Sequence, residues 1–429
     1  MNEVKLVSSE QKSNKGTTLL AVFLFNLTLL SPCAASAQVQ FDIKGLIQSQ
    51  LTLNADDETS YLNRGTGLLR YDDSDKFTLA HTLLQLNADF NGTTSFHATI
   101  NSVEDPKHHI GFTQLFFKYS PLWSKGYRWR FRTGMFYPEI GFENPDIGWL
   151  SPFHYSNSAI NSWIGEEVRT LGGEVKVTRL GRAHGFSPHN FSASFALYKG
   201  NDTAGTLLAW RGWAIHDRQS LTNERIFFAR YPSIGPNSAL PLQAAWVEPY
   251  REVDGRFGYQ FGLHWDYQKQ TQVKYLYYNN NGDDSIVARG GQYAWNTLFS
   301  SLSLQHKFNA QWRLIAHAMV GKTAMGTGKV EVDFDAWYAS LVYRQGPNIL
   351  SLRYDNYATT DTDYMQLIDN NNGHGWAATA TYRRTLNKHW QVGVEWLYVD
   401  SFQASRGQWP DISTDITQQQ LLAIVQFRF

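Results

Sequence analysis

The chain ends with the stretch LLAIVQFRF, residues 421–429, and the pattern of this stretch decides the fold. In an extended strand, alternate side chains point to the same face. The opposite face includes the polar Gln426 and Arg428, whereas one face is wholly apolar and consists of Leu421, Ala423, Val425, Phe427 and Phe429. Most domains finish in a polar, frayed segment, so an apolar strand here predicts that the end of the chain belongs to a sheet.

The same period of two residues recurs along the chain. In LLQLNADF (83–90) and SFHATINSV (95–103), apolar and polar residues alternate, and NGT at 91–93 joins the two stretches into a hairpin. With FDIKGLIQSQLTLN (41–54) and the closing stretch, we count sixteen strands. The other twelve lie at 112–120, 127–136, 171–180, 191–200, 258–267, 271–280, 297–306, 312–322, 335–344, 349–357, 375–384 and 390–400.

The connectors between these strands alternate between short and long. Short ones, such as QGPN at 345–348, follow the even-numbered strands, and long polar ones, such as ATTDTDYMQLIDNNNGH at 358–374, follow the odd-numbered strands. Short turns at one end and long loops at the other are typical of outer-membrane barrels. We therefore predict an all-β fold, a transmembrane antiparallel up-and-down β-barrel of about 16 strands, in which the last strand pairs with the first.

Composition is consistent with a barrel and disfavours other classes. The 429 residues include one Cys and a formal net charge of zero from 38 basic and 38 acidic side chains, which fits neither a disulfide scaffold nor a nucleic-acid binder. Outside the N-terminus, no stretch approaches the eighteen or more apolar residues of a membrane helix. Aromatic residues make up 15% of the chain. We expect many of them to form girdles at the membrane interfaces, among them Tyr127, Trp129, Tyr259, Trp265, Trp312, Trp376, Tyr382, Trp390, Trp396 and Tyr398.

The N-terminus has the pattern of an export signal. Two lysines precede the apolar GTTLLAVFLFNLTLLSP at 16–32, and the small residues of AASAQ follow. We predict a signal peptide over residues 1–37, cut after Ala37, and a barrel over residues 38–429. A membrane anchor is disfavoured because the apolar stretch is short, and lipidation at Cys33 is disfavoured because a proline precedes it.

Charged residues occupy the faces that we assign to the lumen. In YRWRFRTGMF at 127–136, Arg128, Arg130 and Arg132 share one face, which we call the arginine ladder, and aromatic residues hold the other. Like charges at this spacing repel in a dry interior, so the ladder requires water, counter-ions or opposing carboxylates. We therefore expect a water-filled lumen. Its predicted lining also includes Lys118, Lys176 and Glu174.

The opposing carboxylates are expected in the connector that follows the ladder. It is YPEIGFENPDIGWLSPFHYSNSAINSWIGEEV at 137–168, the third long loop, and it contains Glu139, Glu143 and Asp146. Unstructured loops of this length are usually functional. We predict that the loop folds inward and places these acids opposite the arginine ladder across a constriction, where a transverse field sorts solutes by charge. The alternative is an outer lid over a solvated basic wall.

In these stretches the chain resembles Gram-negative outer-membrane porins. Such proteins commonly end in an alternating strand with a C-terminal Phe, and YPEIG at 137–141 is similar to a pattern of the general trimeric porins, whose third loop narrows the pore opposite a basic wall. RTGMFYPEIGFE at 132–143 resembles the phosphate-selective porins. The resemblance implies a passive diffusion channel without a cofactor, and the trimeric group implies a homotrimer.

The longest connector, at 200–256, is rich in tryptophan and arginine. It fits a sugar or anion site, or a latch onto an oligomer neighbour. We favour a folded outer lid with a small tryptophan core and a short hairpin, because aromatic and arginine enrichment marks interfaces in general. Within it, His216, Asp217 and Ser220 loosely resemble a lipid-hydrolysing barrel, but such triples occur often by chance.

Sequence signatures of catalysis are missing. The chain contains no Gly-x-Ser-x-Gly elbow, no His-Glu-x-x-His and no Cys cluster, so we predict no catalytic residue, metal site or cofactor. The spacing of Asp361, Asp363 and Asp369 does not match a calcium loop, and we expect a solvated loop tip there.

The expected function is passive diffusion of small hydrophilic solutes and ions through an outer-membrane porin, whose partners are membrane lipid and solutes and not nucleic acid. A first alternative is a selective channel for phosphate or another anion, with the arginine ladder as its binding site. A second is an outer-membrane enzyme or a surface-binding barrel that uses the long connector at 200–256. Basic lumen residues outnumber acidic ones, which favours anions, but the acids of the third loop could reverse this preference.

Overall fold

Sixteen strands form one closed antiparallel barrel in a computed structural model that describes residues 39–54, 58–72, 76–104 and 107–429. Each barrel strand pairs with the next one along the chain, and all sixteen predicted strands are confirmed. The predicted signal peptide lies outside the described residues. The barrel strands are β1 (Gln40–Asn54), β2 (Lys76–Asp89), β3 (Thr94–Val103), β4 (His109–Tyr119), β5 (Tyr127–Phe136), β6 (Thr170–Arg179), β7 (His189–Lys199), β10 (Gly258–Tyr267), β11 (Thr271–Asn279), β14 (Asn296–Lys307), β15 (Trp312–Met325), β16 (Val330–Gln345), β17 (Asn348–Asp361), β18 (Gly373–Thr385), β19 (Trp390–Gln403) and β20 (Asp415–Arg428).

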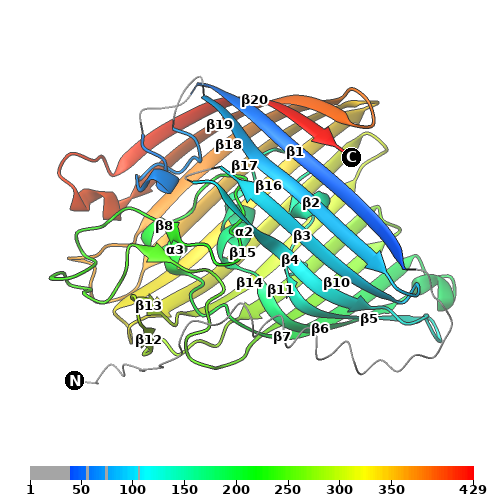
Figure 1. The fold of residues 1–429 in the computed structure, drawn as a ribbon, viewed down its shortest axis with the longest axis horizontal. Coiled ribbons are helices and arrows are strands. Elements are labelled where there is room, and N and C mark those ends of the chain that lie inside the picture. The colour runs from blue at the N-terminus through cyan, green and yellow to red at the C-terminus, as the bar shows by residue number, and fades with distance from the viewer. Residues whose placement is uncertain (1–38, 55–57, 73–75, 105–106) are drawn as a thin grey trace.

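Short turns and long loops lie at opposite ends of the barrel, as predicted (Figure 1). The short turns and the C-terminus lie at the right of the view, and the long loops at the left. No helix in the described ranges is long and apolar enough to cross a membrane. The smaller elements are η1 (Tyr61–Asn63), η2 (Ile147–Trp149), α2 (Ala159–Glu167), η3 (Gly181–Ala183), α3 (Thr206–Trp210), β8 (Ile226–Phe227), β9 (Trp246–Val247), β12 (Val287–Ala288), β13 (Gln292–Tyr293) and η4 (Ala404–Gln408).

β1 and β20 close the barrel, with Leu46 opposite Arg428. At the end of this seam, the backbone N–H of Gly45 donates to the carbonyl of Phe429 at 2.9 Å, and the N–H of Phe429 donates to the carbonyl of Gly45 at 3.2 Å. The Phe429 ring covers Gly45, where a Cβ atom would lie 2.1 Å from a ring carbon. The prediction that the C-terminal strand belongs to the wall is confirmed.

The outer face of the wall is apolar. On β20, Val425 and, just after this strand, Phe429 are 42% and 54% exposed, whereas Ile424 and Gln426 on the other face are buried. The predicted faces of this strand are confirmed. A continuous apolar outer face is the surface that a bilayer requires of a barrel. Other exposed outward residues are Ile43, Trp129, Phe195, Leu263, Leu302, Trp337, Leu350, Tyr382 and Trp396.

The interior differs from the predicted water-filled lumen, because one side of it is an apolar core. Trp163 of α2 packs on Phe299 and Phe334, with ring centroids 5.5 and 5.3 Å apart. Burial of this much apolar surface excludes water from the part of the lumen that these residues line. The wall contributes Phe299, Ile315, Met319, Phe334, Tyr338, Val342, Leu397 and Leu422 to this core.

Candidate functional site

The third loop, residues 137–169, folds into the barrel as predicted. Its helix α2 begins after Ser158, whose hydroxyl accepts a hydrogen bond from the Asn161 N–H at 3.2 Å. All nine residues of α2 are buried. A loop without such contacts would stay in the solvent at the outer end, so the position of this one depends on specific bonds to the wall.

Arg353 of β17 is the main attachment of the third loop. Its Nε donates to Asp355 at 2.8 Å, and its Nη1 lies 3.2 Å from a Glu143 carboxylate oxygen. The same guanidinium donates to the carbonyl oxygens of Ser156 and Asn157 at 2.9 and 2.8 Å. Buried ion pairs are tolerated only when further hydrogen bonds satisfy both partners, and this arginine meets that condition.

A second attachment joins the loop to β18 and β19. Glu395 accepts from the backbone N–H groups of Tyr155 and Ser156, both at 2.7 Å. Arg383 donates to the carbonyl of Ser151 at 2.7 Å, and its guanidinium lies 4.1 Å from the Tyr155 ring centroid. Together, the two attachments hold this part of the loop against β17 to β19.

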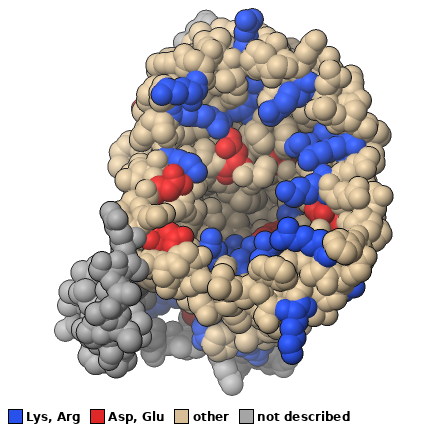
Figure 2. Space-filling model, turned by 90° about the vertical axis from the view of Figure 1, so that its right-hand side faces the viewer, with Lys and Arg blue, Asp and Glu red and all other residues tan. Residues whose placement is uncertain are grey.

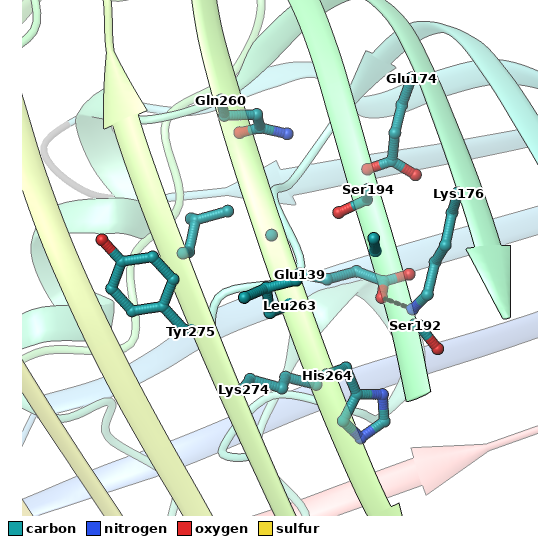
Figure 3. A pocket seen from close by; sticks show the side chains of 13 residues that line it. Glu139, Glu174, Lys176, Ser192, Ser194, Gln260, Leu263, His264, Lys274 and Tyr275 are labelled. Atoms are coloured by element: carbon teal, nitrogen blue, oxygen red, sulfur yellow. Dashed lines mark hydrogen bonds and ion pairs between the residues drawn. The ribbon is translucent and has the colours of Figure 1, made fainter. Parts of the chain in front are cut away.

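On the opposite side of the barrel, the arginine ladder forms a charged cluster. Both carboxylate oxygens of Glu174 accept from Arg132, at 3.0 and 2.7 Å, and one also accepts from Arg130 at 3.0 Å. Glu139 of the third loop contacts Arg130 and accepts from Lys176 Nζ at 2.5 Å (Figure 3). Burial alone would raise the pKa of Glu139, but the charges of Arg130 and Lys176 outweigh it and hold this pKa well below its usual range.

The expected pairing of the ladder with three loop acids is found for one of them. Glu139 contacts the ladder, whereas Glu143 binds Arg353 and Asp146 binds Arg428 at 2.8 Å. The prediction is wrong for Glu143 and Asp146 because the loop crosses the lumen within a few residues of Glu139. Acids that are close together in the sequence therefore contact different strands of the barrel wall.

Side chains on the ladder side remain partly exposed. Arg130 and Glu139 are 27% and 31% exposed, while Arg353 on the opposite side is 0% exposed. Arg128 and Lys118 are exposed, and neither forms an ion pair with another described residue. The exposed and partly exposed charged side chains along β4, β5 and β6, together with Glu139, thus form a water-accessible strip, which we call the basic path.

The short-turn end of the barrel opens into a hollow lined by charges of both signs (Figure 2). At this end, a cavity of about 300 Å³ lies between Asp146, Arg344, Arg383 and Arg428. Beside Glu139, the free space shrinks to about 10 Å³, room for one water molecule. The free space beside Glu139 is therefore much smaller than the cavity at the short-turn end.

Residues 201–222 of the fourth loop also enter the lumen, and nearly all of them are buried. Asp217 ties this segment to the wall. Its carboxylate accepts from Arg70 at 2.6 Å and lies 3.1 Å from His81 of β2. We missed this inward segment in the sequence. The sequence WRGWAIHDRQS at 210–220 carried a sign of this inward course, because tryptophans next to charged residues are not required in a loop that is exposed to solvent.

Glu166 of α2 joins the fourth loop to the third. It binds Arg211 at 2.7 Å and lies 3.1 Å from His216, and its backbone carbonyl contacts the Ser220 hydroxyl. His216, Asp217 and Ser220 thus bond to different partners and do not form a catalytic triad. The short hairpin and the tryptophan core expected in this loop are present, as β8 with β9 and a cluster around Trp210.

Glu167 connects the two inward loops without an ion pair. It accepts from the N–H groups of Gly205 and Leu207 at 3.0 and 2.9 Å, and from Trp163 Nε1 at 2.7 Å. Burial raises the pKa of Glu167 to about 7, because the opposing effects of these hydrogen bonds and of Arg211 are smaller. The contact between the loops therefore contains a carboxyl group that changes charge near neutral pH.

The contribution of Glu167 to the free energy of unfolding is expected to fall as the pH rises from about 4.5 to 7. In this window, folded Glu167 keeps a proton that the unfolded chain has lost, so its contribution is complete below about 4.5 and lost above 7. The total is on the order of 3 kcal/mol. In urea unfolding from lipid vesicles, wild type should therefore lose stability relative to Glu167→Gln between pH 5 and pH 8. Asp411→Asn, which replaces an exposed acid outside both loops, should show no such change relative to wild type, and the same lack of change for E167Q would contradict the assignment.

Three carboxylates at the outer end lie close enough together to hold a cation. Ligand atoms of Asp202, Glu252 and Asp254 lie within 4.8 Å of one another. Asp202 already accepts from the N–H groups of Val253 and Asp254 at 2.5 and 3.2 Å, and Glu252 accepts from the Gly200 N–H at 2.8 Å. These bonds account for the cluster as part of the loop fold, and we assign no metal site to it.

The loop between β17 and β18 is not the expected solvated acidic tip. Asp361 and Asp369 are buried, and Asp369 accepts from the Ser233 hydroxyl at 2.6 Å. The side chains that face solvent include the apolar Tyr364, Leu367 and Ile368. The acids shape the loop from inside, so their spacing carried no information about calcium.

No protein-family model and no curated protein matches the sequence. Solved structures do match the fold. The outer membrane channel DcaP of Acinetobacter baumannii is similar with a TM-score of 0.57 and 10% sequence identity, covering 93% of this chain and 100% of that chain. The trimer form of OmpT, an outer membrane protein of Vibrio cholerae, is similar with a TM-score of 0.52 and 7% identity, covering 91% and 99%. At these identities the likeness concerns the fold.

Proposed function

We propose that the protein is a porin of a bacterial outer membrane, through which small hydrophilic solutes and ions diffuse passively. The observation that carries the proposal is the basic path, a charged and partly exposed strip inside a closed barrel with an apolar outer face. Charged side chains that face water inside a barrel form the lining of a channel, whereas apolar side chains on its outer face contact lipid. The similarity to an outer membrane channel supports the same class.

A preference for anions is the selectivity that the charges favour. A saturable phosphate site is the second candidate, since three arginines share one strand face. Against it, Glu174 already accepts from Arg130 and Arg132, so an anionic solute must compete with a fixed carboxylate. The basic path carries five bases and two acids: Lys118, Arg128, Arg130, Arg132, Lys176, Glu139 and Glu174.

We also propose that three copies assemble, by analogy with the OmpT of similar fold that is described in a trimer form. The same proposal places the third loop at the constriction and residues 1–37 in a signal that is removed on export. Crosslinking of the purified protein tests the trimer, and sequencing of its mature N-terminus tests the signal.

Current through the purified protein in a planar bilayer under a salt gradient tests the proposal as a whole. The expected result is stepwise ohmic conductance, a reversal potential whose sign indicates anion selectivity, and no saturable block by phosphate or by a neutral sugar. Saturable block by phosphate would favour the second candidate. A lack of conductance would contradict both and turn attention to the fourth loop.

In the same experiment, Arg128→Glu is expected to lower the anion-to-cation permeability ratio about fivefold, since a two-unit change in charge beside water is worth ~1 kcal/mol. Arg128 is exposed and makes no ion pair with a described residue, so the exchange breaks no contact. Replacing all three arginines of the ladder is a less specific test, because it leaves the Glu174 carboxylate without its partners Arg130 and Arg132. Arg384→Glu, on an exposed position of β18 near the same end, is the control, and equal shifts in both variants would contradict the assignment.

A further inference from the structure

The outer wall of β5, β6, β7 and β10 carries two rows of cross-strand neighbours. The row nearer to the short turns consists of Tyr127, Arg179, Phe191 and Trp265. Its members alternate with the inward residues, so they face away from the lumen. The second row lies two residues further along each strand and consists of Trp129, Val177, Ala193 and Leu263.

A groove lies over the smallest residue of these rows. Ala193 sits between Val177 and Leu263 within its row, and Phe191 stands beside it along β7. The groove has a volume of about 370 Å³, which is within the range of small-molecule sites, and its exposed lining is apolar. Hydrocarbon fills such a groove more favourably than water does.

Arg179 lies at the edge of the groove and is the single charged residue of the two rows. Its side chain makes no hydrogen bond or ion pair with another described residue. A cation on the lipid side of a barrel is costly unless it reaches the headgroups. Tyr127 and Trp265 in the same row are the residue types that mark the membrane interface, so the guanidinium lies at headgroup level.

Two short turns add positive charge beside Arg179. The turns 120–126 and 180–188 touch, since the Leu180 N–H donates to the Gly126 carbonyl at 2.8 Å. They carry the exposed cations Lys125 and Arg182, and neither turn contains an acidic residue. The patch is therefore complementary to an anion that approaches from the membrane surface.

We propose that this surface is a binding site for an anionic glycerophospholipid, with the phosphodiester on Arg179 and one acyl chain in the groove over Ala193. The spacing fits, because the Ala193 row lies about 7 Å deeper in the wall than the Arg179 row. A lipid supplies the negative charge and the chain in one molecule. A second copy of the protein would have to bring a carboxylate and an apolar ridge in the same geometry.

Native mass spectrometry of the detergent-purified protein with dioleoyl phosphatidylglycerol tests the site, and dioleoyl phosphatidylcholine is the zwitterionic comparison. The wild-type protein is expected to retain more phosphatidylglycerol than phosphatidylcholine. Arg179→Gln should reduce this retention about fivefold, the usual effect of one cation at an anionic surface, and Arg179→Lys should restore most of it. Ala193→Phe should fill the groove and reduce the retention of both lipids.

Arg384→Gln and Ala318→Phe are matched controls, because both replace exposed residues on other strands of the wall. Heat-modified migration on gels shows whether each variant is folded. Equal retention by R179Q and R384Q would overturn the proposal. It would also be overturned if R179Q and A193F dissociated an oligomer and left the lipid count unchanged, because the surface would then bind a second copy.

Discussion

Replacing Arg353 with methionine is expected to release the third loop from the wall and to raise the single-channel conductance severalfold. The exchange leaves the carboxylates of Glu143 and Asp355 buried without their shared cation. Breaking a buried ion pair in this way costs roughly 3–5 kcal/mol, because the remaining charge is stranded in a dry region. The strands keep their own hydrogen bonds, so we expect the loss to fall on the loop.

A compensated variant separates this effect from a general loss of stability. When R353M is combined with Glu143→Gln and Asp355→Asn, no stranded charge remains, and the loop should dock again with a conductance close to wild type. Single-channel recordings and protease sensitivity of residues 137–169 are the measurements. An R353M channel with the conductance and protease resistance of wild type would show that the attachment is unimportant.

Asp217→Ala is expected to have a comparable effect on the fourth loop. The carboxylate of Asp217 is shared by Arg70 and His81, and all three side chains are buried. Its removal should cost roughly 3–5 kcal/mol. Residues 201–222 should then leave the lumen and become accessible to external protease on intact cells. The channel should admit larger neutral solutes.

Arg230→Ala is the matched control for D217A, since Arg230 is an exposed charged residue of the same loop and makes no ion pair with a described residue. It should change neither protease access nor solute size. If D217A alone leaves the protease pattern of wild type, the segment is held by its apolar contacts and not by the ion pair. The effects of D217A and R353M should not add, because α2 of the third loop contacts α3 of the fourth loop.

The sixteen strands could be predicted because each needs one apolar face toward lipid, and a period of two residues shows this in the sequence. The core inside the barrel was harder to see. On β16 both faces are apolar, with Phe334, Tyr338 and Val342 inward and Trp337 and Leu341 outward. The rule that apolar alternates face lipid cannot assign such a strand. Two apolar faces on one strand were the available sign that the lumen holds a packed core.

The candidate site could be predicted where it depends on neighbours in the chain. Glu139 lies a few residues after the arginine ladder, so its contact with Arg130 could be predicted from the sequence. Glu143 meets Arg353 across 210 residues of sequence, and no local pattern reports such a contact. The inward course of residues 201–222 depends on equally distant partners.

The division of the lumen into a charged side and an apolar side also affects how strongly a permeating ion feels the wall. Beside the basic path lies a core of low polarisability in place of bulk water, and charges next to such a boundary are screened less. The attraction of the bases for anions is strengthened, yet every ion also loses part of its hydration energy on entry. A neutral solute has no comparable loss. Neutral solutes should therefore cross more easily, relative to ions, than the width of the passage alone suggests.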